Sequence, residues 1–200
     1  MSRIYSRFSL ALRQILGYNR ERPSMSCIFF ASDHHFGHNN ILRFQRNDGT
    51  LLRPGFSNIE EMDEHLIERW NKVVRPQDKV YHCGDFTMRD TCLSYVKRLN
   101  GHKRLILGNH DKFPVKRYVE AGFEEVYGSR QFEGIICTHI PIHPGSMSRW
   151  KINVHGHLHF GQVTHPIIVG GHIDERYRNV SVEMLKDYKP ISLEEIRSSV

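Results

Sequence analysis

The sequence predicts a single α/β domain, and two observations carry this prediction. Short apolar runs alternate with amphipathic helical segments in the first part of the chain, while strand-like runs dominate the second part. Polar clusters directly follow the apolar runs, as they do where buried strands end in loops. A chain of 200 residues can bury roughly two-thirds of its unfolded surface in one core. Its longest apolar runs fall far short of the ~18 residues that a membrane span requires.

The predicted strands are short apolar runs bounded by turn residues. They cover 27–32, 79–83, 105–107, 134–138, 152–155 and 166–169, and a late strand is expected at 179–183. The first helix opens at Ser57-Asn58-Ile59-Glu60, which has the spacing of a capping box, and ends before Pro76. Two shorter helices are predicted, at 91–99 and at 115–121, and glycines end both of them.

The charge pattern separates a short extension from the domain. Residues 1–24 hold five arginines and one glutamate and supply +4 of the net charge of +6. Their apolar residues recur at helical spacing, which is typical of transit peptides and membrane-surface helices. An upstream extension or a misplaced start is the preferred interpretation, with the domain at 25–200. The near-neutral remainder predicts no dedicated nucleic-acid-binding surface.

The cysteines indicate a reducing compartment. The four of them form neither a CxxC pair nor a dense framework. Free thiols of this kind are typical of cytoplasmic proteins, and we therefore expect a cytoplasmic protein without a transmembrane segment. The sequence leaves the oligomeric state and the host open.

Five polar clusters follow predicted strands directly, and the chain holds 14 histidines in all. Because ligand sites assemble at the carboxyl ends of strands in open α/β sheets, we expect these clusters to meet in space. Carboxylate, amide and imidazole groups together suit Mn²⁺, Fe²⁺, Zn²⁺ or Ni²⁺ better than Ca²⁺. The candidate metal ligands are Asp33, His35, Asp85, Asn109, His139, His157 and His159. Seven ligands are too many for one ion, but two ions that share the Asp85 carboxylate use them all.

The order of these residues resembles the calcineurin-like metallophosphoesterase superfamily, whose motifs are D-x-H, G-D, G-N-H-[DE], H and G-H-x-H. The matching segments are Asp33-His34-His35, Gly84-Asp85, Gly108-Asn109-His110-Asp111, His139 and Gly156-His157-Leu158-His159. The segment 32–38 is similar to the small bacterial and phage members, and the resemblance covers about 25–183. It implies a four-layer αββα sandwich with the active site on loops at the C-terminal ends of the strands.

The resemblance also implies a division of the ligands between two divalent transition-metal ions, with Mn²⁺ preferred. One ion would be held by Asp33, His35, Asp85 and His159, and the other by Asp85, Asn109, His139 and His157. The implied activity is hydrolysis of a phosphate ester by a hydroxide held between the ions. His110 would assist the leaving group, and Asp111 could orient His110.

The substrate class is less sharply predicted than the chemistry. A small phosphodiester is preferred over a phosphomonoester or a phosphoprotein. The alternative is a non-catalytic scaffold of the same fold, but such descendants usually lose ligands or the catalytic histidine, and this chain keeps them all.

The other histidines are expected outside the metal-ligand set. His34 should face away from its neighbours, since side chains alternate along an extended segment, whereas Asp33 and His35 should point the same way. His155 is expected behind the ligands. His38 either touches substrate or braces its loop, and Arg89 is expected at the surface. His82 and His143 are interpreted as loop or core residues, with contacts to the ligands or to substrate as the alternative. The remaining histidines are interpreted as surface or packing residues: His65, His102, His165 and His172. Cys83 and Cys137 are expected to be small buried hydrophobes.

Overall fold

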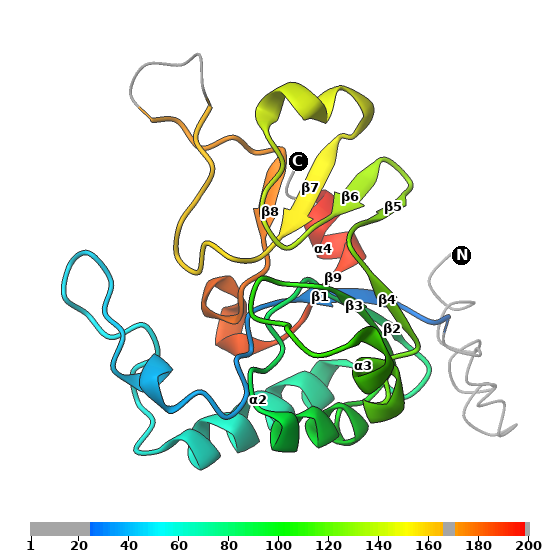
Figure 1. Cartoon of the computed structure of the whole chain (residues 1–200). Coiled ribbons are helices and arrows are strands. Elements are labelled where there is room, and N and C mark those ends of the chain that lie inside the picture. Colours follow the sequence, from blue (N-terminus) through cyan, green and yellow to red (C-terminus); the bar gives the residue numbers. More distant parts are fainter. Residues whose placement is uncertain (1–24, 166–170, 199–200) are drawn as a thin grey trace, which may run out of the picture.

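The computed structural model describes residues 25–165 and 171–198, which form an α/β fold with two mixed sheets (Figure 1). The larger sheet has the strand order β4-β3-β2-β1-β9. Its strands are β1 (Ile28–Ala31), β2 (Lys79–His82), β3 (His102–Ile106), β4 (Glu125–Tyr127) and β9 (Ile191–Ser192). β1 to β4 run parallel, and β9 pairs antiparallel with β1.

The smaller sheet has the order β5-β6-β7-β8. Its strands are β5 (Arg130–Phe132), β6 (Ile135–Cys137), β7 (Ile152–His155) and β8 (Tyr177–Asn179). β6, β7 and β8 are parallel, whereas β5 forms an antiparallel hairpin with β6. Both sheets therefore have a parallel core, and the carboxyl ends of those strands lie along one edge of each sheet.

Aromatic side chains pack the two sheets against each other. The Phe132 ring of β5 stacks on Phe30 of β1 and on Tyr81 of β2, with centroid distances of 6.1 and 5.1 Å. The next residue of β2, His82, points to the opposite face of the larger sheet, where its ring lies 6.4 Å from Trp70 of helix α2 (Ile59–Val73). The alternation along β2 thus supplies both the contact between the sheets and the contact with the helical layer.

The helices pack mainly on the larger sheet, whose outer face carries α2 and α3 (Val115–Ala121) in Figure 1. Within residues 25–165 and 171–198, a third helix, α4 (Leu193–Ser198), follows β9, and there are five 3₁₀ segments. They are η1 (Asn39–Leu42), η2 (Asp90–Arg98), η3 (Pro144–Arg149), η4 (Val182–Met184) and η5 (Lys186–Tyr188). The predicted α/β class is confirmed, and the four-layer stacking stays a prediction.

Helix α2 begins one residue later than the capping box predicts. The N-cap is Asn58, whose side chain accepts the backbone N–H of Glu61 at 2.8 Å. Glu61 in turn accepts the backbone N–H of Ser57, also at 2.8 Å. Both arrangements place a polar residue three positions before a glutamate, and Asn caps helices as well as Ser does.

The segment predicted as a helix at 91–99 is the 3₁₀ helix η2. Its buried side chains include Leu93, Val96 and the following Leu99. A spacing of three matches the three residues per turn of a 3₁₀ helix, so a tighter helix buries all of them on one side.

Several predicted boundaries differ from the structure. The strand expected at 179–183 is β8 followed by a turn into η4. The short strands β4, β5 and β9 contain no fully buried residue, so they lack the apolar run that predicts β6, which has three buried residues. The predicted strand at 166–169 and the extension at 1–24 lie outside the described residues. Within the described ranges, none of the helices is both long enough and apolar enough to span a membrane.

Candidate metal centre

The seven predicted ligands lie on five loops, each of which follows a parallel strand. Asp33 and His35 follow β1, Asp85 follows β2, and Asn109 follows β3. The loop after β6 supplies His139, and the loop after β7 supplies both His157 and His159. The candidate ligands predicted at strand ends therefore come from both sheets.

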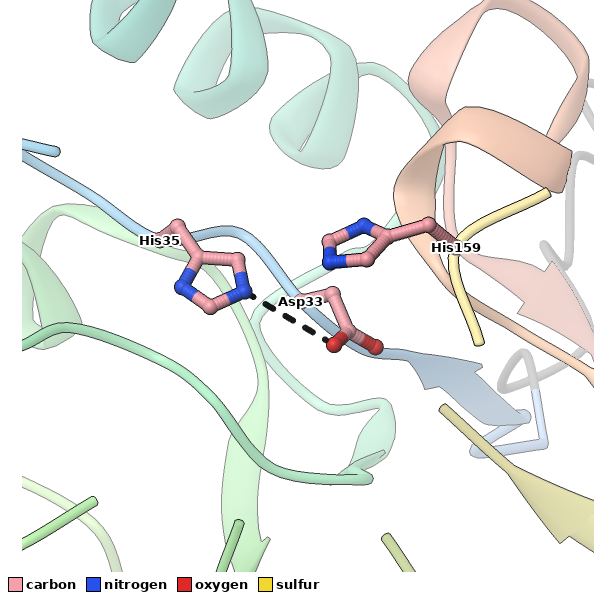
Figure 2. Close-up of side chains that lie close together, drawn as sticks. All are labelled: Asp33, His35 and His159. Atoms are coloured by element: carbon pink, nitrogen blue, oxygen red, sulfur yellow. Dashed lines mark ion pairs between the residues drawn. The ribbon is translucent and has the colours of Figure 1, made fainter. Parts of the chain in front are cut away.

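Asp33, His35 and His159 form the first group of side chains with the spacing of a metal site (Figure 2). One potential ligand atom from each lies within 4.8 Å of the other two. The Nε2 atom of His35 is 3.8 Å from Oδ1 of Asp33, and the imidazoles of His35 and His159 stack with centroids 5.5 Å apart. Asp33, Asp85 and His139 form a second such group with the same spacing.

The Asp85 carboxylate lies between the two halves of the cluster. Its Oδ2 atom is 3.6 Å from Nε2 of His35 and 3.3 Å from Nε2 of His139. On the far side, Oδ1 of Asn109 faces His139 Nε2 at 2.8 Å and His157 Nδ1 at 2.9 Å. Asp85 thus lies within 4 Å of a histidine from each half of the cluster.

The position of the proton on the His139 ring indicates whether the cluster can accept a cation. Its Nδ1 lies 2.8 Å from the backbone carbonyl oxygen of Cys83, which can only accept, so Nδ1 carries the proton. In the neutral ring, Nε2 then directs a lone pair at the oxygens of Asp85 and Asn109. Acceptors that face one another require a proton or a cation between them, and backing of a ligand histidine by a carbonyl is typical of metal sites. The donor set therefore fits a divalent metal ion.

The electrostatics of the cluster agree with a site that attracts cations. Burial lowers the pKa of His139, but the hydrogen bond that protonated His139 donates to Asp85 and the charge of Asp33 outweigh it and raise that pKa. Burial raises the pKa of Asp85, but His139 outweighs this effect and holds the carboxyl pKa below its usual value. The pKa of His157 is lowered by burial and by His139. Both carboxylates of the cluster stay ionised, since the pKa of Asp33 is also lowered by its histidine neighbours against the effect of burial.

The backbone at the ligands is left-handed, contrary to the predicted extended geometry. Positive φ angles occur at Asp33, His35, Asp85, His157 and His159, with values from 49° to 69°. Such conformations cost of order 1–3 kcal/mol each for residues other than glycine and cluster at functional sites. The left-handed turns bring alternate side chains together, so Asp33 and His35 do point the same way, but not by the alternation of a strand.

Two motif glycines allow the loops to approach closely. A Cβ atom on Gly156 would lie 2.2 Å from Asp33 Oδ2 and 2.0 Å from Ser32 Oγ. A Cβ atom on Gly84, whose φ is +95°, would lie 2.6 Å from Nδ1 of His139. Any side chain at either position would displace a candidate ligand.

His110 and Asp111 differ in role. The backbone N–H of His110 donates to Asp85 Oδ1 at 2.8 Å, and the His110 ring lies 5.5 Å from that of His35, at the side of the cluster. The expectation that Asp111 orients His110 is not met, because its carboxylate accepts backbone N–H groups of other residues instead. The donors are Asp85, Phe86 and Gly108, at 2.7, 3.0 and 2.9 Å. Asp111 therefore ties the loop after β2 to the loop after β3.

Two residues that the sequence does not single out lie directly behind the ligands. Glu183 falls at the end of a predicted structural strand, and Arg53 gives no signal because it belongs to no motif. Their side chains are fully buried and lie 2.7 Å apart. Glu183 also contacts Nδ1 of His159 at 3.1 Å.

The remaining predicted residues lie outside the ligand set. His34 is buried and pairs with His82 in the core at 2.8 Å, so its exclusion from the ligands agrees with the structure. His155 is buried behind the site and contacts the Gly156 carbonyl. The ring of His38 lies 5.8 Å from that of His35, which is compatible with either of its two expected roles. The following residues are exposed or half-buried: His65, Arg89, His102, His143, His165 and His172. Cys83 and Cys137 are buried, as expected.

Comparison with known proteins identifies relatives of this chain. Over 184 residues it is 36% identical to the uncharacterized protein MJ1445 of Methanocaldococcus jannaschii, and the match covers 86% of this chain and 89% of that protein. The chain belongs to the same family as this archaeal protein. No family model matches the sequence.

Viral and bacterial relatives extend this family. The Gene 66 protein of Mycobacterium phage L5 is 27% identical over 194 residues, covering 80% of this chain and 87% of the phage protein. A crystal structure of a protein of unknown function from Aquifex aeolicus, AQ665, superimposes with a TM-score of 0.61 at 29% identity. It covers 88% of this chain and 100% of the Aquifex chain. The Aquifex structure shares the fold of this chain. The names of these similar proteins state no activity.

Proposed function

We propose that this protein is a metallophosphoesterase of the calcineurin-like type, which hydrolyses a phosphate ester with two divalent transition-metal ions, Mn²⁺ in preference to Fe²⁺, Ni²⁺ or Zn²⁺. The observation that carries the proposal is the shared position of Asp85 between His35 and His139, at 3.6 and 3.3 Å. Asn109 and His157 complete one side of this carboxylate, and the buried group around Asp33 completes the other.

In this proposal, the residues of the cluster bind the ions and position the phosphate group. Ions at this site would polarise phosphoryl oxygens and lower the pKa of water, which supplies a nucleophile near neutral pH. The histidine and aspartate ligands fix where a phosphate group would sit, at the edge where the two sheets meet. The Cys83 carbonyl holds His139 in the tautomer that leaves Nε2 free to ligate.

His110 is placed to act on the leaving group. It follows Asn109 in the chain, its backbone is held by Asp85, and its ring lies beside His35 without belonging to either group of clustered ligands. A histidine there can donate a proton to the departing oxygen, a contribution of typically 10²–10⁴-fold.

A small substrate suits the space next to the site, and we prefer a small phosphodiester over a phosphomonoester or phosphoprotein. A cavity of about 440 Å³ adjoins the ligand His159. Its lining includes Arg46 and Phe160, and the Arg46 guanidinium lies over the Phe160 ring at 3.2 Å from the centroid. This volume lies within the range of sites for small molecules. The lining offers Arg46 as a contact for an anionic group, beside the acidic Asp48.

The direct test is turnover by the purified chain. It should hydrolyse nitrophenyl phosphodiesters or phosphomonoesters when Mn²⁺, Ni²⁺ or Zn²⁺ is added, and a chelator should abolish the activity. The His139→Ala variant should lose turnover, whereas His102→Ala, at the exposed start of β3, should retain it. A protein that binds two ions but turns over no monoester, diester or cyclic nucleotide would instead be a non-catalytic scaffold.

A further inference from the structure

A buried ion pair lies beneath one half of the candidate metal centre. It joins Arg53, which precedes helix α2, to Glu183 in η4, and the side chains of both residues have no exposed surface. Buried ion pairs contribute little to stability compared with apolar residues of the same volume, because both charges lose their hydration. The contacts of this pair therefore indicate what it does.

Arg53 binds the backbone of the loop that carries the first two ligands. Its guanidinium donates from Nη1 to the carbonyl oxygen of His34 at 2.7 Å and from Nη2 to the carbonyl oxygen of Asp33. The same loop has a positive φ at Asp33 and again at His35. Arg53 thus fixes a turn whose backbone is strained and whose two flanking side chains point toward the same metal position.

Glu183 binds the third ligand of the same group. One oxygen, Oε1, accepts from Arg53 Nε at 2.8 Å and lies 3.1 Å from His159 Nδ1. Because an ionised carboxylate can only accept, the proton of the neutral His159 ring lies on Nδ1. Its Nε2 is then unprotonated and available to a metal. A single carboxylate oxygen therefore links the histidine ligand to the arginine that holds the aspartate ligand.

We propose that Arg53 and Glu183 are positioning residues for the ion bound by Asp33, His35 and His159, an assignment that rests on the metal site of the proposed function. The pair connects the loops after β1 and β7, which belong to different sheets, and holds their ligands at the mutual distance that one ion requires. It makes no such contact with Asn109, His139 or His157 among the hydrogen bonds of the described residues. Asp33 belongs to both groups of clustered side chains, but His159 belongs only to the group with His35. Loss of the Glu183 charge behind His159 should therefore weaken the ion at that group much more than the other.

The experiment is a Co²⁺ titration of the metal-free full-length protein, followed by calorimetry and by visible absorption. Glu183→Gln keeps the size of the side chain but removes the charge behind His159. We expect the affinity for one of the two ions to fall about 10–100-fold, the range typical of lost groups behind metal ligands. The absorption of that ion should also change, while the other ion should bind within about twofold of wild type.

The matched control is Glu124→Gln. Glu124 also contacts Nδ1 of a histidine, His102, but this pair is exposed and lies at the opposite end of β3 from the site. Both ions should bind Glu124→Gln as they bind the wild type. A purely stabilising role for Glu183 would lower the melting temperature of the metal-free protein and leave the ratio of the two affinities unchanged, which would overturn the proposal.

A double variant keeps the proposal testable if the single variant Glu183→Gln does not fold. Arg53→Met/Glu183→Gln leaves no unpaired charge in the core, and we expect it to fold and to show the same selective loss. If neither variant folds, the pair is needed for stability and the positioning role is overturned. If wild type binds two ions but hydrolyses no ester, the proposed function fails while the selective loss still tests this inference. If wild type hydrolyses esters but Glu183→Gln binds both ions as tightly as wild type, the positioning role fails and the proposed function stands.

Discussion

The Oδ2 atom of Asp85 lies 3.3 Å from Nε2 of His139, although the two residues follow strands of different sheets. The contact crosses the edge where β2 and β6 end, and the sheets are held there by the packing of Phe132 on Phe30 and Tyr81. The candidate metal centre therefore depends on the face-to-face packing of two sheets, and neither sheet contains it alone.

Asp85→Asn should reduce the binding of both ions together. The carboxylate faces ligands of both groups, and an amide replaces one charged oxygen by a hydrogen-bond donor. We expect each affinity to fall at least as far as the ~10–100-fold typical of residues behind ligands. Elemental analysis of the dialysed protein measures the number of metal ions bound per chain. The exposed Asp90→Asn serves as the control, and full occupancy in Asp85→Asn would contradict a shared carboxylate.

His110→Ala should separate metal binding from leaving-group chemistry. The variant should keep both ions, since no contact among the described residues makes this ring a ligand of either group. Esters with a nitrophenolate leaving group should be hydrolysed almost as fast as by wild type, because that group departs without a proton. Esters of alkyl or ribose alcohols should slow by about 10²–10⁴-fold. Equal defects on both kinds of ester would assign His110 to substrate positioning instead.

Gly156→Ala should damage the site through steric overlap alone. The added methyl group would lie 2.2 Å from Asp33 Oδ2, so the ligand must move. Overpacking of this kind costs typically 1–3 kcal/mol of stability, and we expect metal affinity to fall as well. Chemical unfolding and a Mn²⁺ titration measure the two effects. Gly128→Ala is the matched control, since a Cβ atom there meets nothing within 4 Å.

Asp63 should make stability depend on pH. Burial, against the opposing hydrogen bond from Gly37 N–H, raises the pKa of this carboxyl from 3.8 to about 7. Between those two values the folded protein holds a proton that the unfolded chain has released, so stability falls as pH rises from 3.8 to about 7 and then no longer depends on this group. Asp63→Asn cannot ionise. Its free energy of unfolding should therefore fall less than that of wild type when the pH is raised from ~5 to ~8. Urea unfolding of the two metal-free proteins at both pH values measures this difference. The same change in the free energy of unfolding in both proteins would exclude a role of Asp63.

Removal of residues 1–24 should leave turnover and melting temperature unchanged. Each predicted ligand, together with His110, Arg53 and Glu183, lies downstream of this segment. The comparison requires the full-length and shortened proteins, assayed side by side with Mn²⁺. A lower melting temperature in the shortened protein would show that the segment packs on the domain. Unchanged turnover with lost membrane or organelle association would favour a targeting role.

The longer elements of the fold could be predicted because their sequence patterns span at least one full period. The helix at 115–121 agrees with α3, and the run at 152–155 agrees with β7. Helix α2 differs from its prediction by one residue because Ser57 and Asn58 are both good caps, and local sequence does not distinguish them. The strands β4, β5 and β9 carry no buried apolar run, unlike the equally short β6, and only pairing with their neighbours defines them.

The sequence by itself determined which side chains gather in the candidate site, since Asp33, Asp85, Asn109 and the histidines stand directly after apolar strands whose parallel pairing gathers their ends at one edge of each sheet. Only the tertiary structure decided how those side chains are held. The left-handed turns at the ligands depend on contacts such as Arg53 with the Asp33 carbonyl. The link from Glu183 to His159 joins residues that no local pattern relates. Hydrophobic periodicity is a property of neighbouring residues, whereas strain and buried charge are stabilised by groups that meet only when the two sheets pack together.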